Sequence, residues 1–316
     1  MTGSQRRGLV VGCGGTLGYA WAVAALAAVE ERLDWDARTA QVLVGTSTGA
    51  EVVSALGSGR SVSDLLAALQ GHPDADPLLL RHVGAHPGAL PPVPWPGLPG
   101  AGLMAGAVLG RVPLGTGLLG LLPRGRGDAG WLRSFGAALA NGRTWLDSSR
   151  TWLVATETRS GRRVAFGSPG APVADIGSAI AASWAIPGWF PPVRIDGRAY
   201  LDGGILSPTS ADLVAPLGLD EVVIVAPMTT SGGAPATGLS RLERVVRRWM
   251  TRTLDAEEHL LRAAGTRVVR IEPSAEELAV MGFNFMNAAR RPATLDVSLR
   301  TAPDRVKAAV DRSITA

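Results

Sequence analysis

The chain has 316 residues, of which 46% are apolar and 18% are charged. This composition excludes a disordered chain and suits one large α/β domain or two small ones. Because 31 basic residues face 27 acidic ones, the charge gives no reason to expect a nucleic-acid partner. The single cysteine, Cys13, excludes an intrachain disulfide and a cysteine-rich zinc site. We therefore expect no cofactor and no metal.

The apolar stretch that follows Arg6 and Arg7 and runs to Val29 admits two interpretations. One is an export signal, even of the twin-arginine type. Glycines between positions 12 and 18 interrupt the stretch, however, and favour a strand, a tight turn and a helix. The longest charge-free run, 83–110, contains several prolines, so we predict no transmembrane helix. We expect a cytoplasmic protein, because nothing in the sequence requires an oxidising compartment.

Short apolar runs alternate with segments of helical composition, which is typical of α/β proteins. The predicted strands are 8–11, 41–44, 151–158, 162–166, 198–202, 221–226 and 267–271. The predicted helices are 19–32, 50–56, 64–70, 128–140, 176–184, 239–264 and 295–314. Ser61 or Ser63 is the expected cap of the third of these helices.

One segment, Gly71 to Gly127, interrupts this alternation. It contains ten prolines and thirteen glycines in 57 residues, and only two acidic residues. Such a density predicts little regular packed structure. Its Leu-rich part, 78–122, forms either a mobile apolar lid that faces lipid or a disordered loop. We predict one domain at residues 7–272 with this insert at 71–127, and a C-terminal helical segment at 273–316 that packs on it.

The sharpest local pattern is Gly45-Thr46-Ser47-Thr48-Gly49, a G-x-S-x-G sequence between an apolar run and a helix. This is the context of a nucleophile elbow. The turn is so sharp that a Cβ atom beside the serine would clash, and the helix N-terminus favours developing negative charge. We interpret Ser47 as a nucleophile. The alternative is an ordinary turn in which Ser47 caps the helix.

A serine nucleophile needs a base, which is usually histidine. The four histidines are His72, His82, His86 and His259. Three lie in the insert and the fourth lies within a predicted long helix, so none fits a Ser–acid–His triad. We interpret them as surface or insert residues without a catalytic task.

Asp202 is the best candidate base, because it ends a short strand and precedes Gly203 and Gly204. Ligand-facing groups of α/β sheets gather at strand ends, although an ordinary turn also explains Asp-Gly-Gly. We expect the block 182–192 to exclude water from the carboxylate and raise its pKa. The aromatic residues of that block are Trp184, Trp189 and Phe190.

The glycine-rich turn 12–18 has three interpretations: a dinucleotide-phosphate loop, an oxyanion hole or a plain turn. A dinucleotide fingerprint that starts at Gly12 needs a small residue where Leu17 stands, and no acid closes the second strand. Backbone amides beside a helix N-terminus suit an oxyanion hole instead. A nucleotide-binding protein is therefore the less favoured alternative.

Together these elements resemble the patatin-like phospholipases and acyl hydrolases. That family combines a glycine-rich oxyanion loop, a G-x-S-x-G pattern one βα unit later, and a distal Asp-Gly-Gly or Asp-Gly-Ala. The corresponding segments here are 13–18, 45–49 and 202–204, and the likeness extends to 154–157 and 182–192.

The resemblance implies a three-layer α/β/α fold with a mainly parallel central sheet. It also implies a Ser-Asp dyad without histidine, in which Ser47 is the nucleophile and Asp202 the base. The amides of Gly14, Gly15 and Thr16 would then form the oxyanion hole.

Two departures from the family pattern bear on function. Cys13 and Leu17 stand where the family has a glycine and an arginine, so the main-chain donors survive but any head-group role of that arginine is lost. Many relatives have an asparagine–proline pair after the Asp-Gly-Gly motif, whereas this chain reads Ile205-Leu206-Ser207-Pro208-Thr209. The sequence alone leaves the consequence for the dyad open.

The predicted activity is hydrolysis of acyl esters or phospholipids by a lipid esterase, phospholipase A or lysophospholipase. The alternative is a non-catalytic lipid-binding or scaffold protein on the same fold. Arg241, Arg244 and Arg248 share one face of a predicted helix, so peripheral contact with an anionic membrane is one interpretation of that helix. The other is a solvated helix that packs one face on the domain.

Overall fold

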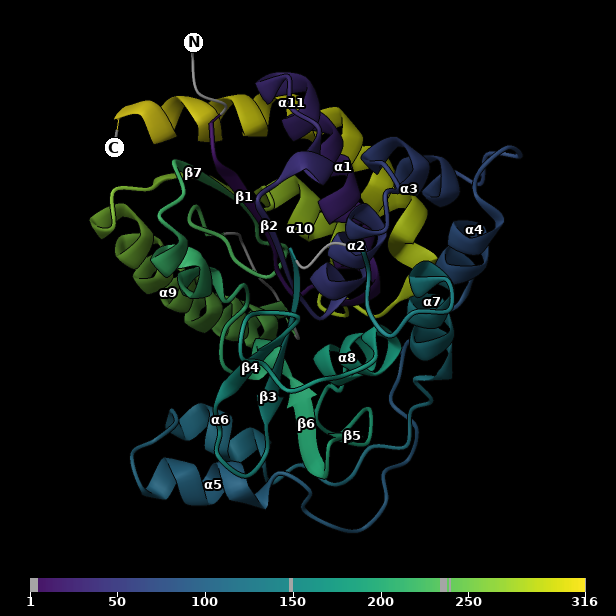
Figure 1. The fold of residues 1–316 in the computed structure, drawn as a ribbon, viewed down its shortest axis with the longest axis vertical. Helices are drawn as coiled ribbons and strands as arrows, with labels where there is room; N and C mark the ends of the chain where they lie inside the picture. Colours follow the sequence, from purple (N-terminus) through teal and green to yellow (C-terminus); the bar gives the residue numbers. More distant parts are fainter. Residues whose placement is uncertain (1–4, 148–149, 234–237, 239, 316) are drawn as a thin grey trace.

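The computed structural model describes residues 5–147, 150–233, 238 and 240–315, and the fold is built on an eight-stranded sheet (Figure 1). The strands are β1 (Arg7–Val11), β2 (Val42–Thr46), β3 (Thr151–Glu157), β4 (Arg163–Phe166), β5 (Val193–Ile195), β6 (Arg198–Asp202), β7 (Glu221–Val225) and β8 (Arg267–Ile271). Their order is β5-β6-β3-β2-β1-β7-β8, and β4 also pairs with β3. Strands β3, β2, β1, β7 and β8 are parallel to one another. Strands β4 and β6 run antiparallel to β3, and β5 runs antiparallel to β6.

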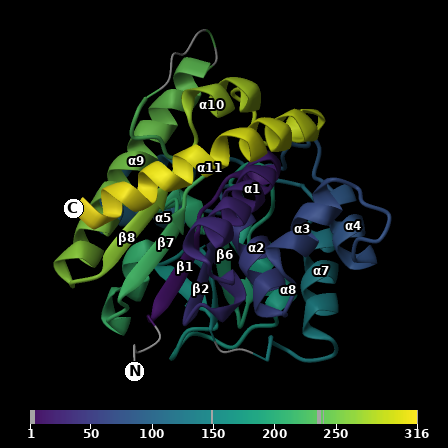
Figure 2. The ribbon, with the colours of Figure 1, turned by 90° about the horizontal axis from the view of Figure 1, so that it is seen from above.

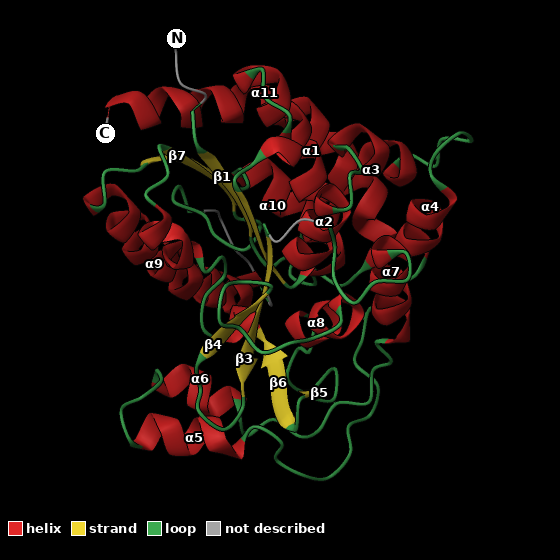
Figure 3. Cartoon of the chain, in the orientation of Figure 1, coloured by secondary structure: helices red, strands yellow, loops and turns green. Residues whose placement is uncertain are grey.

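Helices cover both faces of this sheet (Figure 3). They are α1 (Gly15–Leu33), α2 (Thr48–Gly57), α3 (Val62–Leu69), α4 (Pro77–Gly84), α5 (Ala101–Val108), α6 (Leu114–Leu119), α7 (Gly130–Ala140), α8 (Ile176–Ser183), α9 (Ser240–Ala263), α10 (Ala275–Met281) and α11 (Arg291–Thr315). Helices α1, α2, α8 and α11 pack on one face, and α9 packs on the other. The predicted three-layer fold with a mainly parallel sheet is confirmed.

The central strands are mainly apolar because both of their faces are buried. In β1, Leu9 and Val11 belong to the core beneath α1, while Val10 belongs to the core that Leu254 of α9 completes. Successive side chains of a strand point to opposite faces, so one short run of apolar residues supplies both cores.

Helix α1 lies in the centre of its layer, with α11 packed along it (Figure 2). The apolar stretch that follows Arg6 and Arg7 therefore forms β1 and α1 inside the core. Across the residues that the structure describes, we find no helix with the length and apolar character needed to cross a bilayer.

Most predicted elements are present, with ends that differ by a few residues. Ser61 caps α3 in a capping box with Asp64. Leu239, the predicted first residue of the long helix α9, lies outside the described residues. Strand β5 is an element that the sequence analysis missed.

Most of the insert lies outside regular elements, as predicted, but it also contains three short helices, α4, α5 and α6, which the sequence analysis did not predict. Pro77 lies in the first turn of α4, where the missing backbone N–H would have no hydrogen-bond partner within the helix. Asp76 caps that turn. The glycines of α5 and α6 allow these helices to touch: a Cβ atom on Gly117 would lie 2.5 Å from the Ala107 side chain. The two helices lie together beyond β4 and β6, at the bottom of Figure 1.

Candidate active site

Ser47 lies in the turn between β2 and α2 with φ 56° and ψ −120°, a backbone conformation that L-residues rarely adopt. Both flanking glycines are required: a Cβ atom on Gly45 would lie 2.6 Å from the Ala50 amide nitrogen, and one on Gly49 would lie 2.5 Å from the Val11 carbonyl carbon. Ser47 occupies the N-cap position of α2, but its side chain makes no capping hydrogen bond. The hydroxyl is therefore available to another partner.

A buried serine fixes the backbone of this turn. The Ser47 amide donates a 2.7 Å hydrogen bond to the Ser183 hydroxyl, which in turn donates to the Val154 carbonyl at 2.7 Å. Ser183 ends α8, so the nucleophile turn is tied both to that helix and to β3. The sequence analysis singled out the segment around Ser183 only for its aromatic residues and missed this role.

Asp202 ends β6, which runs antiparallel to β3 and pairs Asp202 with Ala155. Since Thr46 pairs with the neighbouring Val154, this register brings the carboxylate next to the end of the nucleophile strand. The Asp202 side chain accepts a 2.7 Å hydrogen bond from the Gly204 amide, and the Ser47 hydroxyl lies close enough to lower the pKa of its carboxyl group. The structure thus brings the two predicted dyad residues together.

Burial determines the proton affinity of this carboxyl group. Asp202 is only 4% exposed. Desolvation raises its pKa to about 7, although the Gly204 amide and the nearby Ser47 hydroxyl act in the opposite direction.

The expected direction of the pKa change is correct, but the predicted aromatic wall is not its neighbour in the cavity. Ile186 and Pro187 line the cavity that contains Asp202, whereas the Trp184 indole donates a 2.6 Å hydrogen bond to Glu51 elsewhere. The backbone turns after α8, so Trp184 is buried in the core while Ile186 and Pro187 face the cavity.

The glycine-rich loop lies against the same cavity. Gly14 and Gly15 line it together with Ser47, while Thr16 lines a separate cavity of about 20 Å³. No acceptor among the described residues pairs with the amides of Gly14, Gly15 or Thr16, as expected for the first N–H groups of α1. The Thr48 hydroxyl donates a 2.8 Å hydrogen bond to the Gly15 carbonyl and so joins this loop to the nucleophile helix.

The two departures from the family pattern leave this loop intact. Leu17 is fully buried in the core, and its amide donates a 3.0 Å hydrogen bond to the Phe285 carbonyl. Cys13 lines the cavity, and burial raises the pKa of its thiol, so the side chain is neutral.

The cavity around Ser47 has a volume of about 410 Å³ and is mainly apolar. Its apolar walls come from the insert, from the segments after α8, β6 and β7, from α9 and from the segment before α11. They include Leu119, Leu122, Ile186, Pro187, Ile205, Met228, Val245, Val246, Trp249, Met250 and Phe285. A cavity of this size and character suits an acyl chain.

No histidine lines this cavity, although all four lie in the described part of the chain. The exposed ones are His72, His86 and His259. His82 is buried instead: its Nε2 lies 2.5 Å from a Glu51 oxygen, and its ring stacks on Phe135. Glu51 belongs to the first turn of α2, so His82 ties the insert to the nucleophile helix.

The predicted basic face of α9 is only partly exposed. Arg244 is buried against Glu243, which also pairs with the buried Arg247. Val245 and Val246, by contrast, are 54% and 40% exposed at the cavity. The helix therefore presents apolar residues rather than a continuous row of arginines at this position.

Residues 136–215 match the family model of the patatin-like phospholipases. The predicted resemblance to this family is thereby confirmed. The matched range contains Asp202 but neither Ser47 nor the glycine-rich loop. A match to this family supports the activity of a lipid acyl hydrolase in general terms.

Among solved structures, the chain is similar to VipD from Legionella pneumophila, with 13% sequence identity and a TM-score of 0.45. The similarity covers 98% of this chain and 67% of that one. A search of the curated proteins finds no match.

Proposed function

We propose that this protein is a serine acyl-ester hydrolase of the lipid esterase, phospholipase A or lysophospholipase type. The observation that carries the proposal is that Ser47 and the buried Asp202 line one apolar cavity together, beside the unpaired amides of the glycine-rich loop. These are the nucleophile, the base and the oxyanion donors that acyl transfer requires.

Asp202 accepts the Ser47 proton as the serine oxygen attacks the ester carbonyl carbon. The amides of Gly14 and Gly15 stabilise the oxyanion of the tetrahedral intermediate, and Thr16 follows them in the helix. The alcohol leaves with the proton from Asp202, and a serine ester remains. Water then attacks this ester while Asp202 accepts its proton, and Asp202 returns that proton to the Ser47 oxygen as the fatty acid leaves.

The pKa of Asp202 supports this role. An exposed aspartate with a pKa near 3.9 is a weak base, whereas a base with a pKa near the working pH transfers protons most effectively. The value of about 7 for Asp202 meets that condition. A histidine is not needed to supply it.

We also propose that the substrate is reached from a membrane surface and that the protein works in the cytoplasm. Helix α6, which lines the cavity, and helix α5, which packs against it, expose apolar side chains, which soluble surfaces normally avoid. The exposed ones include Val108, Leu109, Leu114 and Leu118. Between Pro77 and Gly127 the sequence has four arginines and no acidic residue, which favours an anionic lipid surface.

A fluorophosphonate probe tests the proposed activity. The wild-type protein and the control Ser63→Ala, which changes an exposed serine of α3, should both become labelled. Ser47→Ala should not become labelled and should not hydrolyse a medium-chain p-nitrophenyl ester. Absence of labelling in the correctly folded wild type would support the alternative, a lipid-binding or scaffold protein without catalysis.

A further inference from the structure

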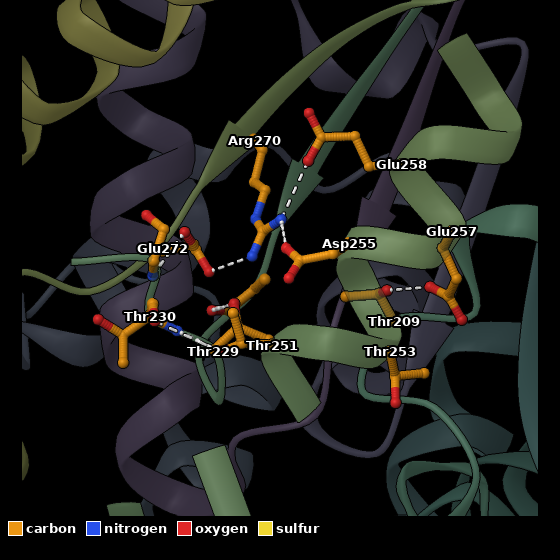
Figure 4. A network of polar contacts seen from close by, with 12 residues as sticks. Thr209, Thr229, Thr230, Thr251, Thr253, Asp255, Glu257, Glu258, Arg270 and Glu272 are labelled. Carbon is orange, nitrogen blue, oxygen red and sulfur yellow. Dashed lines mark hydrogen bonds and ion pairs between the residues drawn. The ribbon is translucent and has the colours of Figure 1, made fainter. Parts of the chain in front are cut away.

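Glu257 of α9 is a buried carboxylate outside the cavity, with only 5% of its surface exposed. One of its oxygens accepts hydrogen bonds from the Ser207 hydroxyl and, at 3.3 Å, from Arg163. The other accepts from the Thr209 hydroxyl at 2.6 Å (Figure 4). It also accepts from the Ala211 amide at 2.9 Å. Burying a charge is costly unless it is paired and hydrogen-bonded, and these donors meet that need.

The donors of Glu257 belong mainly to the segment 207–211, which follows the Asp-Gly-Gly motif. The Ser207 hydroxyl donates a hydrogen bond to Glu257. It also accepts hydrogen bonds from the backbone amides of Thr209, at 3.2 Å, and Ser210, at 2.7 Å. The segment is therefore held in one conformation by side chains. The Ser207 hydroxyl therefore satisfies two backbone amides at this turn.

This segment also supports the two motifs on either side of the nucleophile. The Cys13 amide donates a 2.8 Å hydrogen bond to the Pro208 carbonyl, which fixes the start of the oxyanion loop. The Thr46 hydroxyl, one residue before Ser47, donates to the Thr209 carbonyl at 3.4 Å. A shift of segment 207–211 would therefore move the oxyanion loop and the nucleophile turn together.

We infer that Glu257 is a positioning residue for the reaction: through Ser207 and Thr209 it aligns the oxyanion loop with the Ser47–Asp202 pair. The inference rests on the proposed function. Displacement of a reacting group by about 1 Å can lower a rate about 100-fold, so the alignment has a measurable effect. Loss of the Glu257 charge should lower kcat and leave KM nearly unchanged, because Glu257 does not line the cavity.

The neighbouring residue provides a matched control. Glu258 is partly buried on another side of α9, where it pairs with Arg262 and Arg270 (Figure 4). Glu257→Gln and Glu258→Gln remove the same charge from adjacent positions of one helix. Only the first contacts the segment after Asp202.

The experiment measures kcat and KM for a soluble p-nitrophenyl butyrate ester, and the rate of fluorophosphonate labelling, on the full chain. Glu257→Gln should lower kcat and the labelling rate about 10- to 100-fold, with KM within about twofold. Glu258→Gln should keep both rates within about twofold. Ser207→Ala should reproduce the loss, and the double variant with Glu257→Gln should lose no more than the worse single variant.

Three outcomes overturn the inference while wild-type activity stands: equal kcat for the two glutamine variants, a loss confined to KM, or additive losses with Ser207→Ala. If Glu257→Gln does not fold, the Ser207→Ala variant decides, since a wild-type kcat in that variant refutes the alignment. An inactive and unlabelled wild type would instead reject the proposed function itself.

Discussion

Replacement of Asp202 by asparagine should stabilise the fold in alkaline solution while it removes catalysis, because both effects come from one buried charge. The pKa of about 7 lies about three pH units above the ordinary value of 3.8. A pKa difference of one unit corresponds to about 1.4 kcal/mol. The ionised carboxylate therefore lowers the free energy of unfolding by about 4 kcal/mol. Asparagine keeps the size of the side chain and an oxygen that can accept from the Gly204 amide.

The sign of the pH dependence follows from linkage. Well below pH 4 the folded and unfolded proteins both carry the neutral acid, and the cost is absent. Between about pH 4 and 7 the unfolded chain ionises first, so wild-type stability falls as the pH rises. Above pH 7 the full cost remains. The stability of Asp202→Asn relative to the wild type should therefore increase across this range.

Urea unfolding followed by circular dichroism at several pH values between 4 and 8.5 measures this difference. The difference in free energy of unfolding between variant and wild type cancels the contributions of the other titrating groups. The variant Asp304→Asn changes an exposed aspartate in the same way and serves as the control. In parallel, ester hydrolysis should fall about 10²- to 10⁴-fold in Asp202→Asn. A stability difference that does not grow with pH would refute the buried-base reasoning, and retention of more than about a tenth of the rate would refute the dyad.

Three further predictions concern the histidines, the insert and the elbow. Replacing the three exposed histidines together should leave turnover of a short soluble ester within a few-fold of wild type, and a loss as large as that of Ser47→Ala would revive a triad. A short Gly/Ser linker in place of 98–122 should reduce hydrolysis of long-chain or micellar esters far more than that of a butyryl ester, since Leu119 and Leu122 line the cavity; equal losses would indicate a structural role. Gly49→Ala should abolish labelling by the fluorophosphonate and lower the melting temperature, because its Cβ atom would collide with the Val11 carbonyl group; a fully active Gly49→Ala variant would contradict the close packing of this turn against β1.

The parts of the fold that depend on local pattern could be predicted from the sequence. The β-branched runs before Gly12 and Gly45 became β1 and β2, because strands buried on both faces need uninterrupted apolar residues. Ser47 and Asp202 were singled out by glycines that allow sharp turns, and the structure brings these two residues together.

The insert and the supporting contacts could not be predicted in this way. Proline and glycine usually weaken helices. Here, however, Pro77 begins α4, and Gly117 allows α6 to pack closely against α5. These roles can be recognised only from the tertiary packing. Ser183 and Glu257 lie far along the chain from the residues that they hold. Their roles depend on tertiary contacts, for which a single sequence carries no local pattern.

The length of α9 has a consequence for redesign of substrate preference. A helix rises about 1.5 Å per residue and is stiff, so Met250 and Glu257 stand about 10 Å apart on one rod. Replacing Trp249 or Met250 by a smaller residue removes packing against α9 and allows the helix to tilt. A tilt of α9 also displaces the carboxylate of Glu257. Enlarging the cavity through Leu119 or Leu122 leaves that rod untouched. Engineering of acyl-chain length should therefore start from the insert, where selectivity and turnover can be tuned separately.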